Sequence, residues 1–235
     1  MSLATWWVND PLPALPALPD FVARLASNDV ELAALNQISV IDVRSRRAGG
    51  HQAYIGYLQG LPVTYGWVAT RTASIGELDL AFALPPGDRY LWDFATLPEW
   101  QGRGLYPRLL QAIAVSEAAI AASEAGVAQR LWIIHAPENL PSGAGMHKAG
   151  FESVGQLSFR AEGGVGLAPT GLAARAQAGA TLLGVSLIET VLAPCWHCGN
   201  VTQTRVAADS CWPPVRPNSV QCTCATKINR SLLTT

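Results

Sequence analysis

The chain has 235 residues, of which 49% are hydrophobic and 14% charged, enough for a buried core in one domain with an appendage. Its net charge is -1, so no global field favours nucleic acid or a membrane surface as a partner. No apolar run approaches a membrane span, and no basic segment followed by an apolar run opens the chain, so we expect a cytoplasmic protein without a signal peptide.

The first 20 residues are rich in proline and contain two adjacent tryptophans, Trp6 and Trp7. The prolines between positions 11 and 19 forbid a regular helix, because each fixes φ and lacks an N–H donor. We therefore expect residues 1–20 to form an extended arm that the tryptophans anchor. The alternative is a motif that binds a partner protein.

Hydrophobic periodicity predicts the elements that follow. We expect a helix over 21–38 that Asn28 or Asp29 caps at its second turn, a β-rich run over 39–47, and two strands within 53–69 joined at Gln59 and Gly60. A third strand over 75–84 precedes the central strand, which begins at Tyr90. Further along the chain we expect a long alanine-rich helix to 128, a buried strand over 131–134, a short helix within 139–148 and a strand over 151–159.

Residues 90–113 read as a strand, a tight glycine turn and a helix, and the remaining elements are arranged around them. The turn is Gln101–Gly104, where glycine lets the backbone pass close to a bulky ligand. The first amides of the following helix have no partner within the helix and carry partial positive charge, which suits a diphosphate. Arg103 would add a full charge, whereas the alternative is a tight corner without a ligand.

This stretch resembles motif A of the GNAT acyltransferases (Gcn5-related N-acetyltransferases), whose signature is Arg or Gln, two residues, Gly, one residue, and Gly or Ala. Here it runs from Gln101 to Tyr106, with Tyr106 in the place of Gly or Ala. The segment that begins at Asn139 and ends at Phe151 is similar to motif B. The resemblance covers residues 21–160. It implies an α+β fold with a mixed, mainly antiparallel central sheet flanked by helices.

The resemblance implies that the chain transfers an acetyl group from acetyl-CoA to an amine by direct attack on the thioester. The pantetheine arm would lie between residues 94–97 and the strand at 131–134, and a free backbone N–H within 95–97 would polarise the carbonyl. The residues expected to bind the cofactor are Phe94, Ala95, Thr96, Leu97, Gln101, Gly102, Arg103, Gly104, Leu105, Tyr106 and Asn139.

The candidate general bases are Asp93, Glu77 and His135, with Asp79 beside Glu77. Asp93 lies among apolar residues of the central strand, where burial would raise its pKa toward that of a useful base. The alternative is a carboxylate paired with an arginine or a backbone group. Many family members use a tyrosine as general acid at the position occupied here by Met146, which cannot donate a proton. Either the thiolate leaves without help, or another residue serves, or the enzyme is impaired.

All five cysteines follow position 194. The pairs Cys195 with Cys198 and Cys222 with Cys224 suit a closed tetrahedral zinc site that would stabilise a small segment. Cys211 and His197 are alternative ligands, and free thiols or disulfides are the alternative to a metal.

The expected domains are the arm over 1–20, the acyltransferase domain over 21–160, a linker with a helix within 161–193, and a Cys-rich zinc-binding segment over 194–230. The acceptor is a small-molecule or peptide amine: a polyamine, an aminoglycoside, an amino acid or a protein N-terminus. The tail either closes over the acceptor site or mediates a homodimer. A second hypothesis is a catalytically impaired module that binds CoA or a partner protein through the Cys-rich tail.

Overall fold

The computed structural model describes residues 1–121, 129–160 and 163–189, which form two compact units. The larger unit comprises Leu3–Ile134 and Pro141–Ser153. The smaller unit comprises Met1–Ser2, His135–Leu140 and the described residues from Val154 onward.

The sheet of the larger unit has the strand order β1-β8-β7-β4-β3-β2. Strands β2, β3, β4 and β7 pair antiparallel with their neighbours, whereas β7 and β8 pair in parallel and are joined through helix α3. The bounds are β1 Ser2–Trp7, β2 Phe21–Leu25, β3 His51–Leu58, β4 Leu61–Ala69, β7 Asp88–Thr96 and β8 Arg130–His135. The predicted mixed, mainly antiparallel sheet flanked by helices is confirmed.

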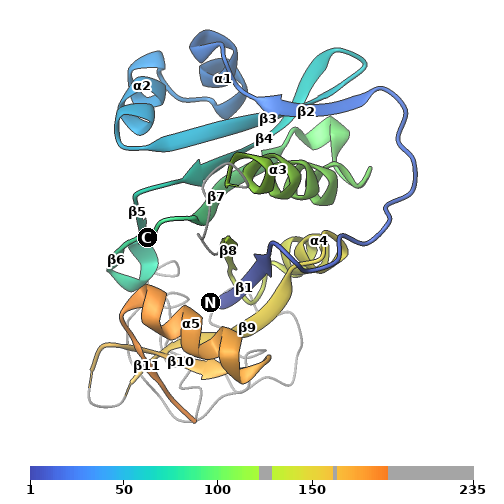
Figure 1. Cartoon of the computed structure of the whole chain (residues 1–235). Helices are drawn as coiled ribbons and strands as arrows, with labels where there is room; N and C mark the ends of the chain where they lie inside the picture. The colour runs from blue at the N-terminus through green and yellow to red at the C-terminus, as the bar shows by residue number, and fades with distance from the viewer. Residues whose placement is uncertain (122–128, 161–162, 190–235) are drawn as a thin grey trace, which may run out of the picture. The chain divides into compact units, whose positions relative to one another are not determined.

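Helices cover both faces of this sheet (Figure 1). Helices α1 (Asp29–Asn36) and α2 (Val40–Ala48) share one core cluster with β3 and β4, centred on Leu32, Val43 and Trp67. Helices α3 (Leu105–Ala121) and α4 (Leu140–Lys148) share the other cluster, which contains most of the large apolar side chains of α3. Strands β4 and β7 are the two central strands of this sheet, with an apolar cluster on each face.

The helix predicted over 21–38 is wrong in its first part, because Phe21–Leu25 pairs with β3 as an edge strand. The predicted cap is correct: the Asn28 side chain accepts hydrogen bonds from the N–H groups of Val30 and Glu31 and starts α1. The β-rich run expected over 39–47 is helix α2 instead. Its start is fixed by a capping box in which Ser39 and Asp42 satisfy each other's backbone N–H.

The single strand predicted over 75–84 is a separate hairpin of β5 (Thr72–Ile75) and β6 (Leu80–Ala83), with the 3-10 turn η1 (Gly76–Leu78) between them. Asp79 has φ 49°, in the left-handed region, and this residue reverses the chain. Alternating burial in both arms produced the strand-like pattern, but the reversal was not visible in it.

The predicted arm begins with strand β1, in which Trp6 is buried at 3% exposure. Residues 8–20 contain no helix or strand and run along α3. Gln111 Nε2 donates to the Pro13 carbonyl at 2.8 Å, and the Arg108 guanidinium donates to the Pro16 carbonyl. The prolines exclude helix here, and side chains of α3 bind the carbonyl groups that remain.

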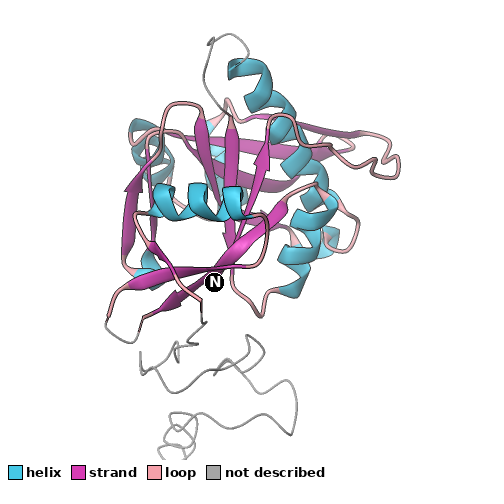
Figure 2. Cartoon of the chain, turned by 60° about the horizontal axis from the view of Figure 1, so that its bottom comes forward, coloured by secondary structure: helices cyan, strands magenta, loops and turns pink. Residues whose placement is uncertain are grey.

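The smaller unit pairs β9 (Glu152–Phe159) antiparallel with β10 (Val165–Pro169), which pairs in parallel with β11 (Ser186–Leu187). Helix α5 (Ala173–Leu183) contacts β10 and β11 (Figure 2). It ends at Gly184, whose φ of 65° terminates the helix predicted over 172–188. None of the helices in the described ranges has the length and apolar character of a membrane span.

Candidate functional site

Strand β7 carries a bulge at Asp93. Trp92 pairs with Trp67 and Ala95 pairs with Tyr65, so two residues of β7 face the single residue Gly66 of β4. Asp93 has φ 50°, a left-handed conformation that costs free energy in any residue with a side chain. Such bulges redirect side chains and are frequent beside active sites.

The bulge reverses the usual alternation of side chains. Trp92 contacts the α1 and α2 core and Asp93 bonds side chains from the same face, whereas Phe94 packs into the α3 core. A Cβ on Gly66 would lie 2.0 Å from the Phe94 ring, so the missing side chain at Gly66 admits that ring. Asp93 is thereby held on the α1 and α2 face at the point where β7 bends.

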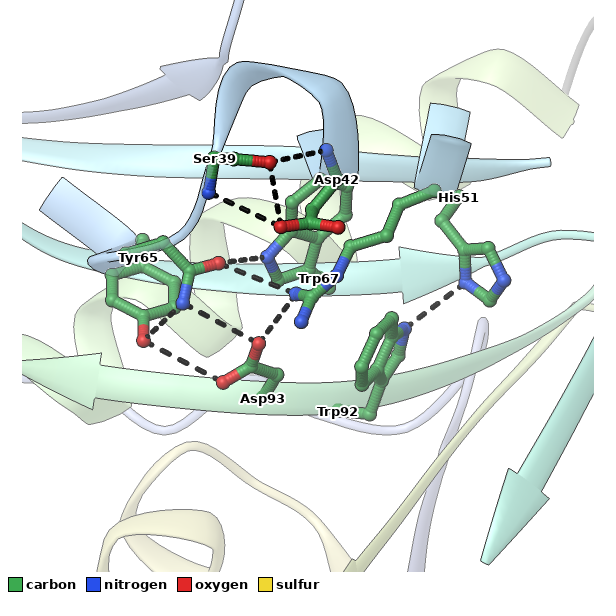
Figure 3. Close-up of polar contacts among 9 residues, drawn as sticks. Ser39, Asp42, His51, Tyr65, Trp67, Trp92 and Asp93 are labelled. Atoms are coloured by element: carbon green, nitrogen blue, oxygen red, sulfur yellow. Dashed lines mark hydrogen bonds and ion pairs between the residues drawn. The ribbon is translucent and has the colours of Figure 1, made fainter. Parts of the chain in front are cut away.

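The Asp93 carboxylate is surrounded by three donors (Figure 3). Arg46 Nη1 donates to Oδ2 at 2.5 Å, Asn36 Nδ2 lies 3.4 Å from the same oxygen, and the Tyr65 hydroxyl lies 3.5 Å from Oδ1. The Asp93 side chain retains 27% exposure, so solvent reaches it. The alternative of a carboxylate paired with an arginine is therefore realised, in a position that is still open.

Asn36 connects this carboxylate to the core. Its Nδ2 donates to the Tyr65 hydroxyl at 2.6 Å, and its Oδ1 accepts from Trp67 Nε1 at 2.7 Å. Burial and the nearby Asp93 charge raise the pKa of Tyr65 to about 12, so its hydroxyl stays protonated at neutral pH. Asn36 and Tyr65 are therefore neutral donors beside Asp93, in addition to the cationic Arg46.

Helix α2 brings Arg46 to the site. Arg47 anchors the helix by donating to Asp29 at 2.9 Å and to the Ala26 carbonyl at 2.7 Å. Arg46 is the preceding residue of the same turn, and its guanidinium carbon lies 4.9 Å from the Trp67 ring centroid and 4.6 Å from that of Trp92. The two ring centroids are 6.0 Å apart, so both indoles lie on the same side of the guanidinium and hold it by cation–π contacts.

His51 completes the cluster at the far side of Trp92. Its Nδ1 accepts a hydrogen bond from Trp92 Nε1 at 3.1 Å, and its ring stands edge-on to the indole. Burial lowers the pKa of His51, and the charges of Arg46 and Arg71 lower it further. His51 is therefore a neutral acceptor that orients Trp92.

The other edge of β7 becomes free of β8 beside the bulge. The parallel ladder runs from Asp88 to Leu91, whereas β7 continues to Thr96. The Leu97 N–H donates to the Val63 carbonyl, and the Ala95 carbonyl accepts from Thr64 Oγ1, so both residues direct their backbone groups toward β4. By strand alternation, the N–H groups of Phe94 and Thr96 point to the opposite edge. Within 95–97, Thr96 is thus the candidate oxyanion donor and Leu97 is not.

The glycine turn precedes α3 as predicted, and Gly102 and Gly104 have φ values of 75° and 69°. No atom lies within 4 Å of a Cβ built on Gly102, so the turn faces open space. Gln101 does not extend outward, since its Nε2 donates to the Thr96 carbonyl at 3.0 Å and holds the turn against β7. The space and the free amides at the start of α3 fit a diphosphate.

The two arginines of the turn have different positions. Arg103 is exposed, stacks at 4.6 Å over the Trp100 ring and lies 3.4 Å from the Glu99 carbonyl. Arg108, which sequence reasoning missed, returns over the turn and donates to the Gly104 carbonyl at 2.6 Å. In the described part of the chain neither guanidinium is paired with a carboxylate. Neither charge is therefore neutralised by a carboxylate of the described residues, although the Arg108 guanidinium also donates to the Pro16 carbonyl.

Tyr106 packs across the space between α3 and α4. The centroid of its ring lies 5.6 Å from that of Phe94, and its hydroxyl lies 3.4 Å from Ser142 Oγ. A Cβ built on Gly145 would lie 2.4 Å from the nearest atom of the Tyr106 ring. Burial raises the pKa of Tyr106 to about 12. Met146, at the position of the expected acid, is buried in the α3 core. The ring thus points toward α4.

The remaining candidate bases lie on other elements of the chain. Glu77 is exposed in η1, and its charge acts on Tyr90, whose pKa is raised by burial first and by Glu77 second. Asp79 is the turn residue after η1. His135 and Asn139 belong to the smaller unit, where His135 Nδ1 lies 2.8 Å from the Ala136 carbonyl oxygen. Their proposed roles stay predictions.

The predicted zinc ligands Cys195, Cys198, Cys222 and Cys224 lie outside the described residues, as do the alternative ligands Cys211 and His197. Within residues 1–121, 129–160 and 163–189, no group of three or more His, Cys, Asp or Glu side chains is arranged to hold a metal ion. The zinc site stays a prediction.

Sequence reasoning identified Asp93 but missed Asn36, Arg46, Tyr65 and His51 as its surroundings. One signal was available: Ser39 followed three residues later by Asp42 is a helix-start pattern, and it would have placed Arg46 one helical turn beyond Asp42. The others are brought together by pairing between β3, β4 and β7, which no local pattern records.

No protein-family model matches the sequence, and no curated protein matches it. Among solved structures, the chain is similar to a GCN5-related N-acetyltransferase from Kribbella flavida (19% identity, 65% of this chain and 53% of that one, TM-score 0.42). It is also similar to a GNAT-family acetyltransferase from Streptococcus pneumoniae (16%, 61% and 92%, 0.40) and an aminoglycoside acetyltransferase in complex with coenzyme A and kanamycin (20%, 61% and 90%, 0.44). The chain thus spans about half of the Kribbella protein, and similarity at this level assigns no activity.

Proposed function

We propose that the chain is an N-acyltransferase that moves an acetyl group from acetyl-CoA to an amine. The observation that carries this proposal is the end of β7. There the strand leaves β8, bulges at Asp93 and runs directly into a glycine turn and the start of α3. A carboxylate, unpaired backbone N–H groups and a helix N-terminus thus follow one another within a few residues.

The turn supports binding of the diphosphate. The N–H groups of Gly104, Leu105 and Tyr106 precede the first complete helical turn, whereas Pro107 has no N–H to contribute. Arg108 lies on the same turn and, with Arg103, supplies charge to it. The pantetheine arm would follow the β7 edge that carries the N–H groups of Phe94 and Thr96.

Asp93 is the residue proposed to accept the proton of the acceptor ammonium, directly or through one water. The amine nitrogen then forms a bond to the thioester carbonyl carbon, the C–S bond breaks, and the thiolate takes up a proton. The Thr96 N–H is proposed to donate to the carbonyl oxygen as negative charge develops on it. Much of the acceleration would come from holding the two reactants together.

A second candidate function is a CoA-binding module without turnover. The observation that favours it is Met146, which is buried at the position where a proton donor was expected. The Tyr106 ring also fills space between β7 and α4. The module hypothesis predicts that acetyl-CoA binds and that no amine is acetylated.

The test is release of free CoA from acetyl-CoA in the presence of a panel of amines. We expect transfer to at least one amine, and we expect Asp93→Asn to lower its kcat/KM by about 100-fold or more, as loss of a general base does. The matched control is Glu152→Gln, which removes an exposed carboxylate on β9 that has no role in the proposed chemistry and should leave the rate unchanged. Binding of acetyl-CoA without release of CoA from any amine would favour the module.

A further inference from the structure

Toward the described residues, Arg46 uses only one end of its guanidinium group. Nη1 donates to Asp93 at 2.5 Å and lies 3.3 Å from Asn36 Oδ1. No acceptor among the described side chains and backbone groups bonds to Nε or Nη2. An arginine has five N–H donors, and those on Nε and Nη2 lie along one straight edge. That edge is therefore unoccupied.

The side chain that carries this edge is partly exposed and held in place. The Arg46 side chain retains 25% exposure, and cation–π contacts with Trp67 and Trp92 and the bond to Asp93 restrain its guanidinium. Structural arginines of this unit use their donors differently: Arg47 binds Asp29 and the Ala26 carbonyl, and Arg89 binds Glu117 and the Asp88 carbonyl. An oriented, solvent-reaching pair of donors is the arrangement that binds a carboxylate in a bidentate manner.

We propose that the acceptor amine is a free amino acid, whose carboxylate binds Nε and Nη2 of Arg46 while its ammonium group binds Asp93. This inference rests on the proposed acyl transfer and names its substrate class. The Arg46–Asp93 pair presents a positive and a negative group side by side, and an amino acid carries the complementary two charges on adjacent groups. After transfer, the amide product is neutral at nitrogen and loses its ion pair with Asp93, which favours its release.

The local charges argue against the other acceptors. Arg46 and Arg71 both lie close enough to His51 to lower its pKa, and Asp42 interacts with Arg46, so the cluster is not strongly acidic. His51 itself is neutral. A polyamine or an aminoglycoside brings several positive charges and no carboxylate, so it would face the guanidinium of Arg46 without compensation. A protein N-terminus has no carboxylate beside its amine.

The experiment compares amino acids with the amines that result from their decarboxylation, such as phenylalanine with phenethylamine and histidine with histamine. In the wild type we expect kcat/KM for at least one amino acid to exceed that for its amine. Arg46→Met should lower this preference by about 10-fold or more, because hydrogen bonds to charged groups contribute that much to binding. Arg46→Lys keeps the charge without the planar pair of donors, so its preference should lie between those of the wild type and Arg46→Met.

The matched control is Arg47→Met on the same turn of α2, which should leave the preference unchanged because Arg47 binds only Asp29 and the Ala26 carbonyl. A purely structural role for Arg46 would lower both rates equally and leave the ratio unchanged. That result, or a wild type that prefers the decarboxylated amines, would overturn the inference.

Binding measured without acetyl-CoA separates this inference from the proposed function. Calorimetry with the same amino acids should show binding to the wild type that Arg46→Met weakens. If the amino acids bind in this way but no acetyl group is transferred, the carboxylate site stands and the acyltransferase proposal fails. If amines are acetylated but no amino acid binds, the acyltransferase proposal stands and the inference fails.

Discussion

The two faces of the central sheet hold arginine–carboxylate pairs of different kinds. On the α3 face, Glu117 is 1% exposed, and its two carboxylate oxygens accept from the Tyr54 hydroxyl at 2.7 Å and from Arg89 Nε at 2.7 Å. On the α1 and α2 face, the Arg46 and Asp93 side chains are 25% and 27% exposed, and Arg46 has an unused edge. The first pair is nearly closed to solvent, with side chains 13% and 1% exposed, whereas the second is partly open.

The difference indicates what each pair does. A buried pair holds elements together, and removing one member leaves a charge without compensation. A pair with free donors and solvent access, held beside a strained residue, is available to a ligand. Replacing the arginine on the α3 face should therefore lower mainly the stability. Replacing the arginine on the α1 and α2 face should lower mainly the activity.

The largest expected effect is that of Arg89→Met on stability. It leaves the Glu117 carboxylate buried with Tyr54 as its remaining side-chain donor, so we expect a loss of roughly 3–5 kcal/mol in the free energy of unfolding. Urea denaturation followed by tryptophan fluorescence measures this. A loss below about 1 kcal/mol would mean that the pair behaves like an exposed ion pair and does not hold the elements together.

Gly145→Ala tests how tightly the side chains between α3 and α4 are packed on the closed face of the sheet. The added Cβ would lie 2.4 Å from the Tyr106 ring, which Phe94 holds on its other side. We expect a loss of roughly 1–3 kcal/mol, typical of overpacking. The double variant with Tyr106→Leu should recover part of it, and no recovery would contradict the contact.

Arg46→Met is the counterpart of Arg89→Met on the open face. Asp93 then keeps Asn36 and Tyr65 as donors and gains access to solvent, so we expect a loss of only about 1–2 kcal/mol. The same urea denaturation measures it. A loss equal to that of Arg89→Met would abolish the distinction between the two pairs.

The smallest effect is the pH dependence contributed by His51. Its folded pKa lies below the ordinary value of 6.5, so the unfolded chain binds more protons between the two values. The His51 contribution to stability is complete above pH 6.5 and decreases as the pH falls toward the folded pKa. His51→Gln should reduce that dependence. In Arg46→Met, histidine NMR should show the His51 pKa moved upward, since a positive neighbour is gone.

The sequence predicted β7, the glycine turn and α3 because each has a strong local signal. The signals are an apolar run, two glycines close together, and apolar residues at helical spacing. It failed at α2, where Val40, Ile41 and Val43 suggested a strand although the capping box of Ser39 and Asp42 starts a helix. It found Asp93 by its unusual place in an apolar strand. It could not find the bulge, because the extra residue depends on pairing with Gly66 and not on any local pattern.

The most direct test of the account is calorimetric titration of acetyl-CoA into the full chain, compared with a short thioester that lacks the diphosphate, S-acetyl-N-acetylcysteamine. The account predicts saturable binding of one acetyl-CoA per chain, weakened by added salt, and much weaker binding of the short thioester. Absence of acetyl-CoA binding, or equal affinity for the two thioesters, would contradict the assignment of the β7 edge and the glycine turn.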